Sequence, residues 1–328
     1  MLNNYTLSVL LGIVEGLTEF LPVSSTAHLR IAEKLCQDYH LANINLETPY
    51  WKMYTIVIQL GAILALPILF MPHILKLLGN FPRGEKGDRT IFTHPLSLTM
   101  LAFVVTAVPA KLLDKVISKN LDNFFVMGAA LVIGGIIMWI VDYMYGEKKV
   151  AAAGIDAMHG TLVNQAMASA GTVELVEPVT RRTTKIEQVT IKQAIFVGIA
   201  QIFAAVFPGT SRSMSTIAGG QLAGMSRPAA LEFSFFVSIP TMFAATVYAL
   251  LKAIHPKDPG EAFSPKSMDK NDWIILGIGF GVSFVVSLGV VAAFMAWVRR
   301  RGFVPFAIYR ILAGGYLLWW AWKDLKGA

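Results

Sequence analysis

Runs of predominantly apolar residues, each close to the length of a membrane-spanning helix, recur along this 328-residue chain. A helix needs about 20 such residues to cross the hydrocarbon core of a bilayer. Only 15% of the residues are charged, against about 25% in an average soluble domain. We therefore expect an all-α polytopic membrane protein, because helices satisfy their own backbone hydrogen bonds in lipid. Six full transmembrane helices are expected, at about 51–71, 95–113, 124–145, 230–251, 273–297 and 304–322.

Two shorter apolar stretches, 7–22 and 193–207, each lead into a proline and then into hydroxyl-rich sequence. Proline cannot continue the helical hydrogen-bond ladder. Irregular backbone persists in a membrane only where protein buries it or where it lines a wet cavity. We therefore predict two re-entrant helix-turn-helix segments, at about 7–35 and 193–226, whose turns face one another.

The two short stretches align with each other. Residues 10–26 (LLGIVEGLTEFLPVSST) and 196–212 (FVGIAQIFAAVFPGTSR) match at glycine, isoleucine, proline and serine, which sets Ser25 on Ser211. A second match pairs IGGIIMW (133–139) with AGGYLLW (313–319). Chance could supply either match alone, but together they indicate a duplicated unit.

Each unit has one re-entrant segment and three full spans. Because three is odd, the chain leaves the first unit on the opposite side of the membrane, and the second copy is inserted upside down. We predict an inverted-topology repeat whose halves are residues 1–146 and 193–328. The more polar stretch between them, 147–192, is expected to be a cytoplasmic insert, partly disordered, in which His159 is a solvated loop residue. We expect no signal peptide, because two glutamates interrupt the first apolar stretch.

Arginine is concentrated on one expected side of the membrane. The connections 36–50, 114–123 and 252–272 on the opposite side contain none. The positive-inside rule therefore makes the arginine side cytoplasmic and lets the first re-entrant segment enter from the outer face. The net charge of +7 thus gives no reason to expect nucleic acid as a partner. The arginines on the expected cytoplasmic side are Arg83, Arg89, Arg181, Arg182, Arg299, Arg300 and Arg301.

Charged and hydroxyl side chains gather around the first turn. Glu15 and Glu19 lie four apart, on one helix face, where like charges repel and resist desolvation. A divalent metal, an arginine or a shared proton would offset this. The serines and threonine that follow, Ser24, Ser25 and Thr26, are suited to cap a helix, bind phosphate or act as a nucleophile. His28 lies one turn after Ser25, a spacing at which it could take a proton from a hydroxyl or a water. A structural role remains an alternative for each residue.

The second turn, PGTSRSMST (208–216), combines hydroxyl groups with an arginine. A guanidinium group can bind two phosphate oxygens at once. The partner of Arg212 would be the glutamates of the first half, a substrate phosphate, or each in turn. Taken together, the carboxylates, hydroxyls, histidine and arginine favour binding and hydrolysis of a phosphoryl group. The carboxylates could hold Mg²⁺ or Ca²⁺. The lone Cys36 excludes an intramolecular disulfide.

EGLTEFLPVSSTAH together with PGTSRSMST resembles the undecaprenyl-diphosphate phosphatase, or bacitracin-resistance, family, over nearly the whole chain apart from the insert. Two residues depart from the family pattern: Met214 and Ala27 stand where glycine is usual. The resemblance implies an enzyme of the bacterial inner membrane that converts undecaprenyl diphosphate to the monophosphate carrier for peptidoglycan synthesis. It thereby implies bacitracin resistance. The motif positions carried over are Glu15, Glu19, Ser24, Ser25, Thr26, His28, Gly209, Ser211, Arg212, Ser213 and Thr216.

The expected roles follow from these assignments. Ser25 attacks the terminal phosphorus, His28 acts as general base and then acid, and Arg212 stabilises the phosphoryl charge. Glu19, with Glu15, holds a divalent cation or orients His28, and the remaining motif residues bind the substrate. Direct attack by water is an open variant, and a polyprenyl-phosphate flippase is the alternative function. The expected partners are undecaprenyl diphosphate and other polyprenyl diphosphates, membrane lipid and, as one assembly, a homodimer.

Overall fold

The computed structural model describes residues 2–42, 44–120, 123–145, 182–254 and 268–327. This part of the chain is helical and contains no strand, with a single isolated bridge between Thr183 and Met225. Most of the predicted insert and His159 lie outside the described residues. The helices of the first half are α1 (Asn4–Thr18), α2 (Ser25–Asp38), α3 (Pro49–Leu69), α4 (Met71–Gly79), α5 (Pro95–Leu112), α6 (Asp114–Asn120) and α7 (Phe124–Tyr145). The short helix η1 (Ile186–Gln188) lies in the predicted insert, and the helices of the second half are α9 (Ile191–Val206), α10 (Arg212–Leu222), α11 (Arg227–Ile254), α12 (Lys270–Arg301) and α13 (Val304–Gly327).

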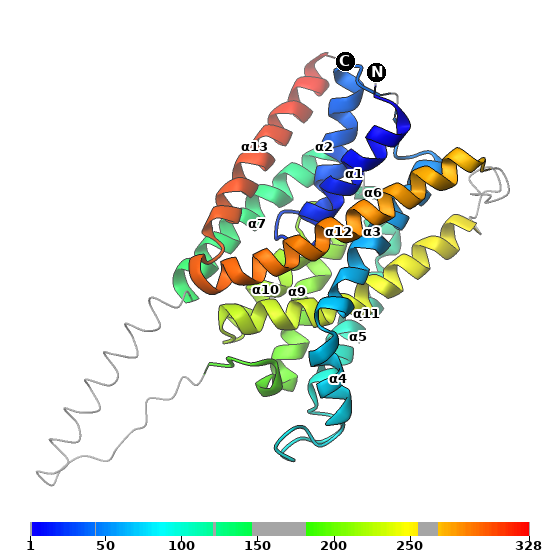
Figure 1. The fold of residues 1–328 in the computed structure, drawn as a ribbon. Coiled ribbons are helices and arrows are strands. Elements are labelled where there is room, and N and C mark those ends of the chain that lie inside the picture. Colours follow the sequence, from blue (N-terminus) through cyan, green and yellow to red (C-terminus); the bar gives the residue numbers. More distant parts are fainter. Residues whose placement is uncertain (1, 43, 121–122, 146–181, 255–267, 328) are drawn as a thin grey trace, which may run out of the picture.

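Five helices of the described chain have the length and apolar composition needed to cross a membrane: α3, α5, α7, α11 and α12. They correspond to the first five predicted spans. The sixth, α13, is long enough but is not among them. Arg310 lies within it, and α13 packs along α7 (Figure 1).

Both short apolar stretches are broken helices, as predicted. α1 and α2 are separated by residues 19–24, which we call the first elbow, and α9 and α10 by residues 207–211, the second elbow. The alignment of Ser25 with Ser211 needs a correction. Ser24 and Ser211 are the residues that precede α2 and α10, because the second elbow has one more residue between its proline and its last serine.

The connections that carry arginine lie together at one end of the molecule, as predicted. Arg89 donates to the carbonyl groups of Glu187 and Val189. Arg227, at the start of α11, binds Asp142 near the end of α7, and the backbone N–H of Phe303 donates to the same carboxylate. The end of the predicted insert, from residue 182, is therefore packed structure.

The opposite end is joined by a separate set of contacts. Lys34 on α2 forms an ion pair with Asp324 on α13, and Tyr50 at the start of α3 donates to the carbonyl of Asp272 on α12. Figure 1 places both chain termini at this end, away from α4. The first half therefore starts from this end and the second half from the arginine end, which is the path expected of an inverted repeat.

Packing in the two halves follows the same plan. α1 packs on α12, and α9 packs on α5. A Cβ added at Gly12 would lie 2.9 Å from the carbonyl oxygen of Gly279, and one added at Gly198 would lie 2.7 Å from that of Ala102. In both halves, the first helix of the broken pair thus approaches its partner helix closely at a glycine. In addition, α7 and α13 pack against each other.

Candidate active site

The two elbows end in the same unusual backbone conformation. Ser24 has φ 75° and Ser211 has φ 69°, and both precede the first residue of a helix. Residues other than glycine rarely adopt positive φ, because the Cβ atom crowds the backbone. Such strain persists only where the surrounding structure enforces it, and it concentrates at functional sites. Each elbow therefore aims the N-terminus of a short helix, α2 or α10, into the centre of the molecule.

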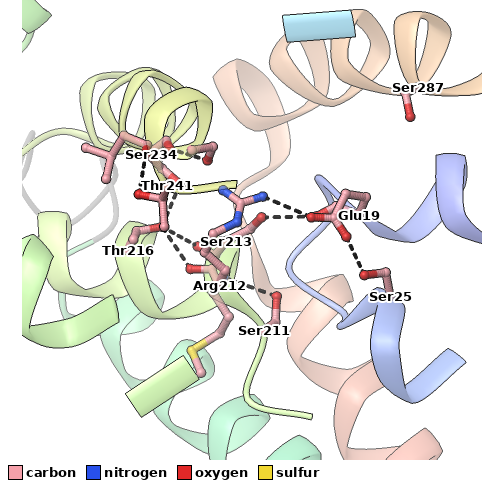
Figure 2. A network of polar contacts seen from close by, with 12 residues as sticks. Glu19, Ser25, Ser211, Arg212, Ser213, Thr216, Ser234, Thr241 and Ser287 are labelled. Carbon is pink, nitrogen blue, oxygen red and sulfur yellow. Dashed lines mark hydrogen bonds and ion pairs between the residues drawn. The ribbon is translucent and has the colours of Figure 1, made fainter. Parts of the chain in front are cut away.

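Glu19 joins the two elbows (Figure 2). The hydroxyl group of Ser25 donates to Oε2 of Glu19, and the Nη2 atom of Arg212 lies 3.4 Å from Oε1. Ser213 donates to the backbone carbonyl of Glu19 at 3.4 Å. Glu19 itself is only 8% exposed. One buried carboxylate thus bridges a serine of the first half and an arginine of the second, although they lie 187 residues apart in the sequence.

These residues line a cavity of about 640 Å³. Its walls are largely apolar and come from α5, α9 and α11, and Lys111, Asp114 and Tyr248 line it toward the end of the molecule opposite the arginine-bearing connections. The Nη1 atom of Arg212 is buried without a partner, so a donor remains free at the cavity. The predicted site residues that line it are Glu19, Ser24, Ser25, Thr26, Gly209, Ser211 and Arg212.

His28, which was expected to take a proton from Ser25 or from water, makes no hydrogen bond with Ser25. The Nδ1 atom of His28 contacts the carbonyl oxygen of Ser24 at 2.7 Å, and its Nε2 atom contacts the hydroxyl group of Tyr309 at 2.6 Å. The ring also stacks on Tyr309. Both ring nitrogens are therefore occupied away from the cavity, because His28 turns back along α2 toward α13. This geometry corrects the expected Ser25–His28 pair and gives Glu19 the position beside Ser25.

Ser213 and Thr216, which were expected to bind substrate, are not among the residues that line the cavity. Thr216 is fully buried, donates to the carbonyl oxygen of Arg212 at 2.9 Å and lies 2.6 Å from the hydroxyl group of Ser234. Figure 2 shows this hydroxyl cluster behind Arg212. Helical geometry gives the reason: Ser213 lies about 100° around α10 from Arg212, and Thr216 lies about one full turn further along the helix. Both residues therefore support α10 and the elbows.

Met214, which replaces the glycine usual in the resembled family, causes no distortion of the second elbow. It lies in the first turn of α10, is 3% exposed, and is not among the described residues with positive φ. The residue that needs glycine is Gly209, at φ 92°, where an added Cβ would also overlap the backbone of Met127. Ala27 is buried in the core, as a small residue should be.

The two glutamates fit a divalent cation only in part. Glu15 is 1% exposed, and its carboxyl group interacts with that of Glu19. No group of three or more His, Cys, Asp or Glu side chains in the described chain could hold a metal ion. Mg²⁺, however, is commonly bound by one or two carboxylates together with substrate phosphates and water. The two glutamates would therefore need the phosphates of a substrate to complete the coordination of an ion.

Three positions near the site were not singled out in the sequence. Tyr309 and Arg310 contact His28 and the elbows from α13. Gln201, which aligns with Glu15, lines the cavity with a buried Oε1 atom that has no partner. The presence of an arginine within an apolar span was the signal that could have identified Arg310.

The fold and the site define a class: a polytopic helical membrane protein whose two broken helices bring a carboxylate, a serine and an arginine to one cavity. The chain belongs to the family described as bacitracin resistance protein BacA, whose model matches residues 8–316.

Similar proteins span nearly the whole chain. A protein of Koribacter versatilis named undecaprenyl-diphosphatase is 51% identical over 323 residues, covering 98% of this chain and all of the relative. Proteins with the same name from Novosphingobium aromaticivorans and Caldanaerobacter subterraneus are 38% and 35% identical, over 95% and 94% of this chain and 96% and 93% of their own lengths.

Proposed function

We propose that this chain is a membrane phosphatase that hydrolyses undecaprenyl diphosphate to undecaprenyl phosphate and inorganic phosphate, so that it recycles the lipid carrier of peptidoglycan synthesis and confers bacitracin resistance. One observation carries the proposal: Glu19 binds both Ser25 and Arg212 at a cavity with apolar walls. The polar floor suits the diphosphate, and the walls suit the first prenyl groups. The names of the relatives agree with this activity.

In the proposed reaction, Ser25 attacks the terminal phosphorus and gives its proton to Glu19, the acceptor of its hydrogen bond. A bond forms between the serine oxygen and phosphorus, and the bond from phosphorus to the bridging oxygen breaks. Glu19 passes this proton to the departing undecaprenyl phosphate and is a carboxylate again. A water molecule then attacks the phosphoserine, and the bond between phosphorus and the serine oxygen breaks. Glu19 takes the proton from the water and gives it to the serine oxygen, so that inorganic phosphate and free Ser25 result. Direct attack by water, with Ser25 as a phosphate ligand, remains the variant.

Charge stabilisation in this reaction comes from Arg212 and from the N-termini of two helices. The transferred phosphoryl group spreads negative charge over its oxygens. Arg212 has a free Nη1 donor at the cavity, and α2 and α10 direct their N-termini there, where backbone N–H groups and the helix dipole favour anions. The Nε2 atom of His28 is hydrogen-bonded to Tyr309. His28 would therefore affect this step in one of two ways: by positioning Ser24, or after a rearrangement of its ring.

A divalent cation, Mg²⁺ or Ca²⁺, is part of the proposal. Glu15 and Glu19 would hold it with the substrate phosphates, and when bound it would neutralise phosphate charge. Phosphate release should then fall when EDTA is added and return with excess Mg²⁺ or Ca²⁺. Release that is insensitive to chelation would count against the cation and leave the serine chemistry in place.

We also propose that the protein resides in the bacterial inner membrane and that its cavity opens to the outer face. The cavity extends to Lys111 and Asp114, at the end of the molecule whose connections contain no arginine, and the positive-inside rule directs that end outward. Assembly as a homodimer and action on other polyprenyl diphosphates stay predictions.

The experiment that tests the function measures phosphate release from undecaprenyl diphosphate by the purified protein in detergent. Hydrolysis predicts stoichiometric phosphate and undecaprenyl phosphate. A flippase, the alternative, releases no phosphate, and the relatives' names do not favour it. Wild-type protein that moves labelled lipid across vesicles without releasing phosphate would overturn the proposal.

A further inference from the structure

Arg310 is the largest fully buried side chain of the described residues, at 0% exposure. No carboxylate is paired with it in the part of the chain that the structure describes. Its guanidinium group instead donates to backbone carbonyl oxygens. Burial of an arginine without a counter-charge is costly, so a residue kept in this state calls for an explanation.

The carbonyl groups that Arg310 binds belong to both elbows. Nη1 lies 2.9 Å from the carbonyl oxygen of Pro22 in the first elbow. Nη2 lies 3.1 Å from that of Gly209 and 2.9 Å from that of Thr210 in the second. A further contact, 3.2 Å, reaches Ala130 on α7. One side chain on α13 therefore ties together the two segments that carry the site.

We infer that Arg310 is a positioning residue for catalysis: it sets the spacing of the two elbows, and through them the distance between Ser25 and Glu19 on one side and Arg212 on the other. Pro22 lies between Glu19 and Ser25 in the chain, and Thr210 lies two residues before Arg212. A guanidinium group can hold both backbones at once, because its donors form a rigid planar fork. This inference rests on the catalytic assignments proposed above.

The neighbouring helix is shaped to admit this side chain. A Cβ added at Gly134 on α7 would overlap the guanidinium group of Arg310, and would lie 2.7 Å from the Cε atom of Met214. Substitution of Gly134 with alanine should therefore displace Arg310 without removing its charge. A matched control exists in the same helix pair: a Cβ at Gly128 would lie 2.9 Å from Leu318 and 3.1 Å from the carbonyl oxygen of Gly314, and its three nearest atoms belong to these two residues.

The test compares Arg310→Met, Arg310→Lys, Gly134→Ala and Gly128→Ala as full-length proteins. Phosphate release from undecaprenyl diphosphate is measured per molecule in the monodisperse fraction, so that loss of folded protein does not lower the value. We expect kcat to fall roughly 100-fold in Arg310→Met and in Gly134→Ala, the cost of misplacing a reacting group by about 1 Å. KM should change less than about threefold, because the cavity walls are intact.

Arg310→Lys should retain at least about ten times the kcat of Arg310→Met, since a lysine ammonium group can still donate to some of the carbonyls. Gly128→Ala should keep the wild-type kcat. Folded Arg310→Met or Gly134→Ala with kcat within about threefold of wild type would overturn the inference. So would failure of both to yield folded protein, because Arg310 would then serve the fold. An inactive wild type would instead contradict the function itself.

Discussion

At the scale of single residues, the site depends on one carboxylate with two partners. Glu19 accepts a hydrogen bond from Ser25 through one oxygen and faces Arg212 through the other. In the proposed reaction, Glu19 removes a proton from Ser25 and Arg212 stabilises the charge of the phosphoryl group. A neutral amide of the same shape could keep the geometry but could not accept the proton. The roles of charge and shape can therefore be separated at this residue.

Glu19→Gln should lower kcat by at least about 100-fold with little change in the melting temperature, because general-base catalysis contributes about 10²–10⁴-fold. Phosphate release and thermal unfolding in detergent measure the two effects. Glu85→Gln, the same change at an exposed glutamate that does not line the cavity, is the control and should leave kcat close to that of the wild type. Near-normal turnover of Glu19→Gln would contradict the assignment.

Arg212→Ala should abolish measurable phosphate release with the fold intact, since an arginine that stabilises a transferred phosphoryl group is worth about 10³–10⁵-fold. Arg212→Lys should recover only part of the loss, because lysine lacks the planar fork. Turnover of the alanine variant within about tenfold of the wild type would show that the free Nη1 donor has no catalytic use.

At the scale of elements, the elbows are short turns in which a serine takes a conformation suited to glycine. Ser211 offsets part of the strain, because its side chain caps α10 by accepting a hydrogen bond from the N–H of Met214 at 3.4 Å. Ser24 makes no such capping bond. The two elbows thus share a backbone shape but differ in what stabilises it.

Ser24→Gly should raise the melting temperature more than Ser211→Gly. Relief of positive φ is worth about 1 kcal/mol at either position, while only the change at Ser211 removes a cap. Differential scanning fluorimetry in detergent compares the two variants with wild type. Equal shifts, or a larger gain for Ser211→Gly, would contradict this account of the elbows.

The existence of both broken helices could be predicted from the sequence. A proline followed by hydroxyl residues in an apolar stretch interrupts a membrane helix and requires a polar or protein-buried environment. The residue-by-residue correspondence of the elbows could not. The alignment has no means to detect the residue inserted between Pro208 and Ser211, so it paired Ser25 with the wrong serine. The orientation of the His28 side chain could not be predicted either, because it depends on a contact with Tyr309, 281 residues away in the sequence.

At the scale of the whole molecule, the two halves run in opposite directions and meet at the elbows. That arrangement places the acidic segment and the arginine segment face to face, which neither half could do alone. At one end of the molecule, hydrogen bonds of Arg89, Arg182 and Arg227 join neighbouring segments. At the other end, the ion pair between Lys34 and Asp324 joins α2 to α13. We expect the two ends to lie at opposite faces of the membrane.

Cysteine labelling can assign these faces. In a Cys36→Ser background, Lys86→Cys should be protected from a membrane-impermeant reagent in intact cells, and Lys270→Cys should react. The positive-inside rule predicts this result, and both side chains are exposed. The reverse pattern would place the mouth of the cavity, near Lys111, on the cytoplasmic face.

The most direct test of the account is a rapid-quench experiment with undecaprenyl diphosphate that carries a labelled terminal phosphate. Ser25 should acquire the label in the wild type, and Ser25→Ala should neither acquire it nor release phosphate above about 10⁻³ of the wild-type rate. Phosphate release that persists in Ser25→Ala, without any labelled protein, would contradict the role of Ser25 as the nucleophile held by Glu19.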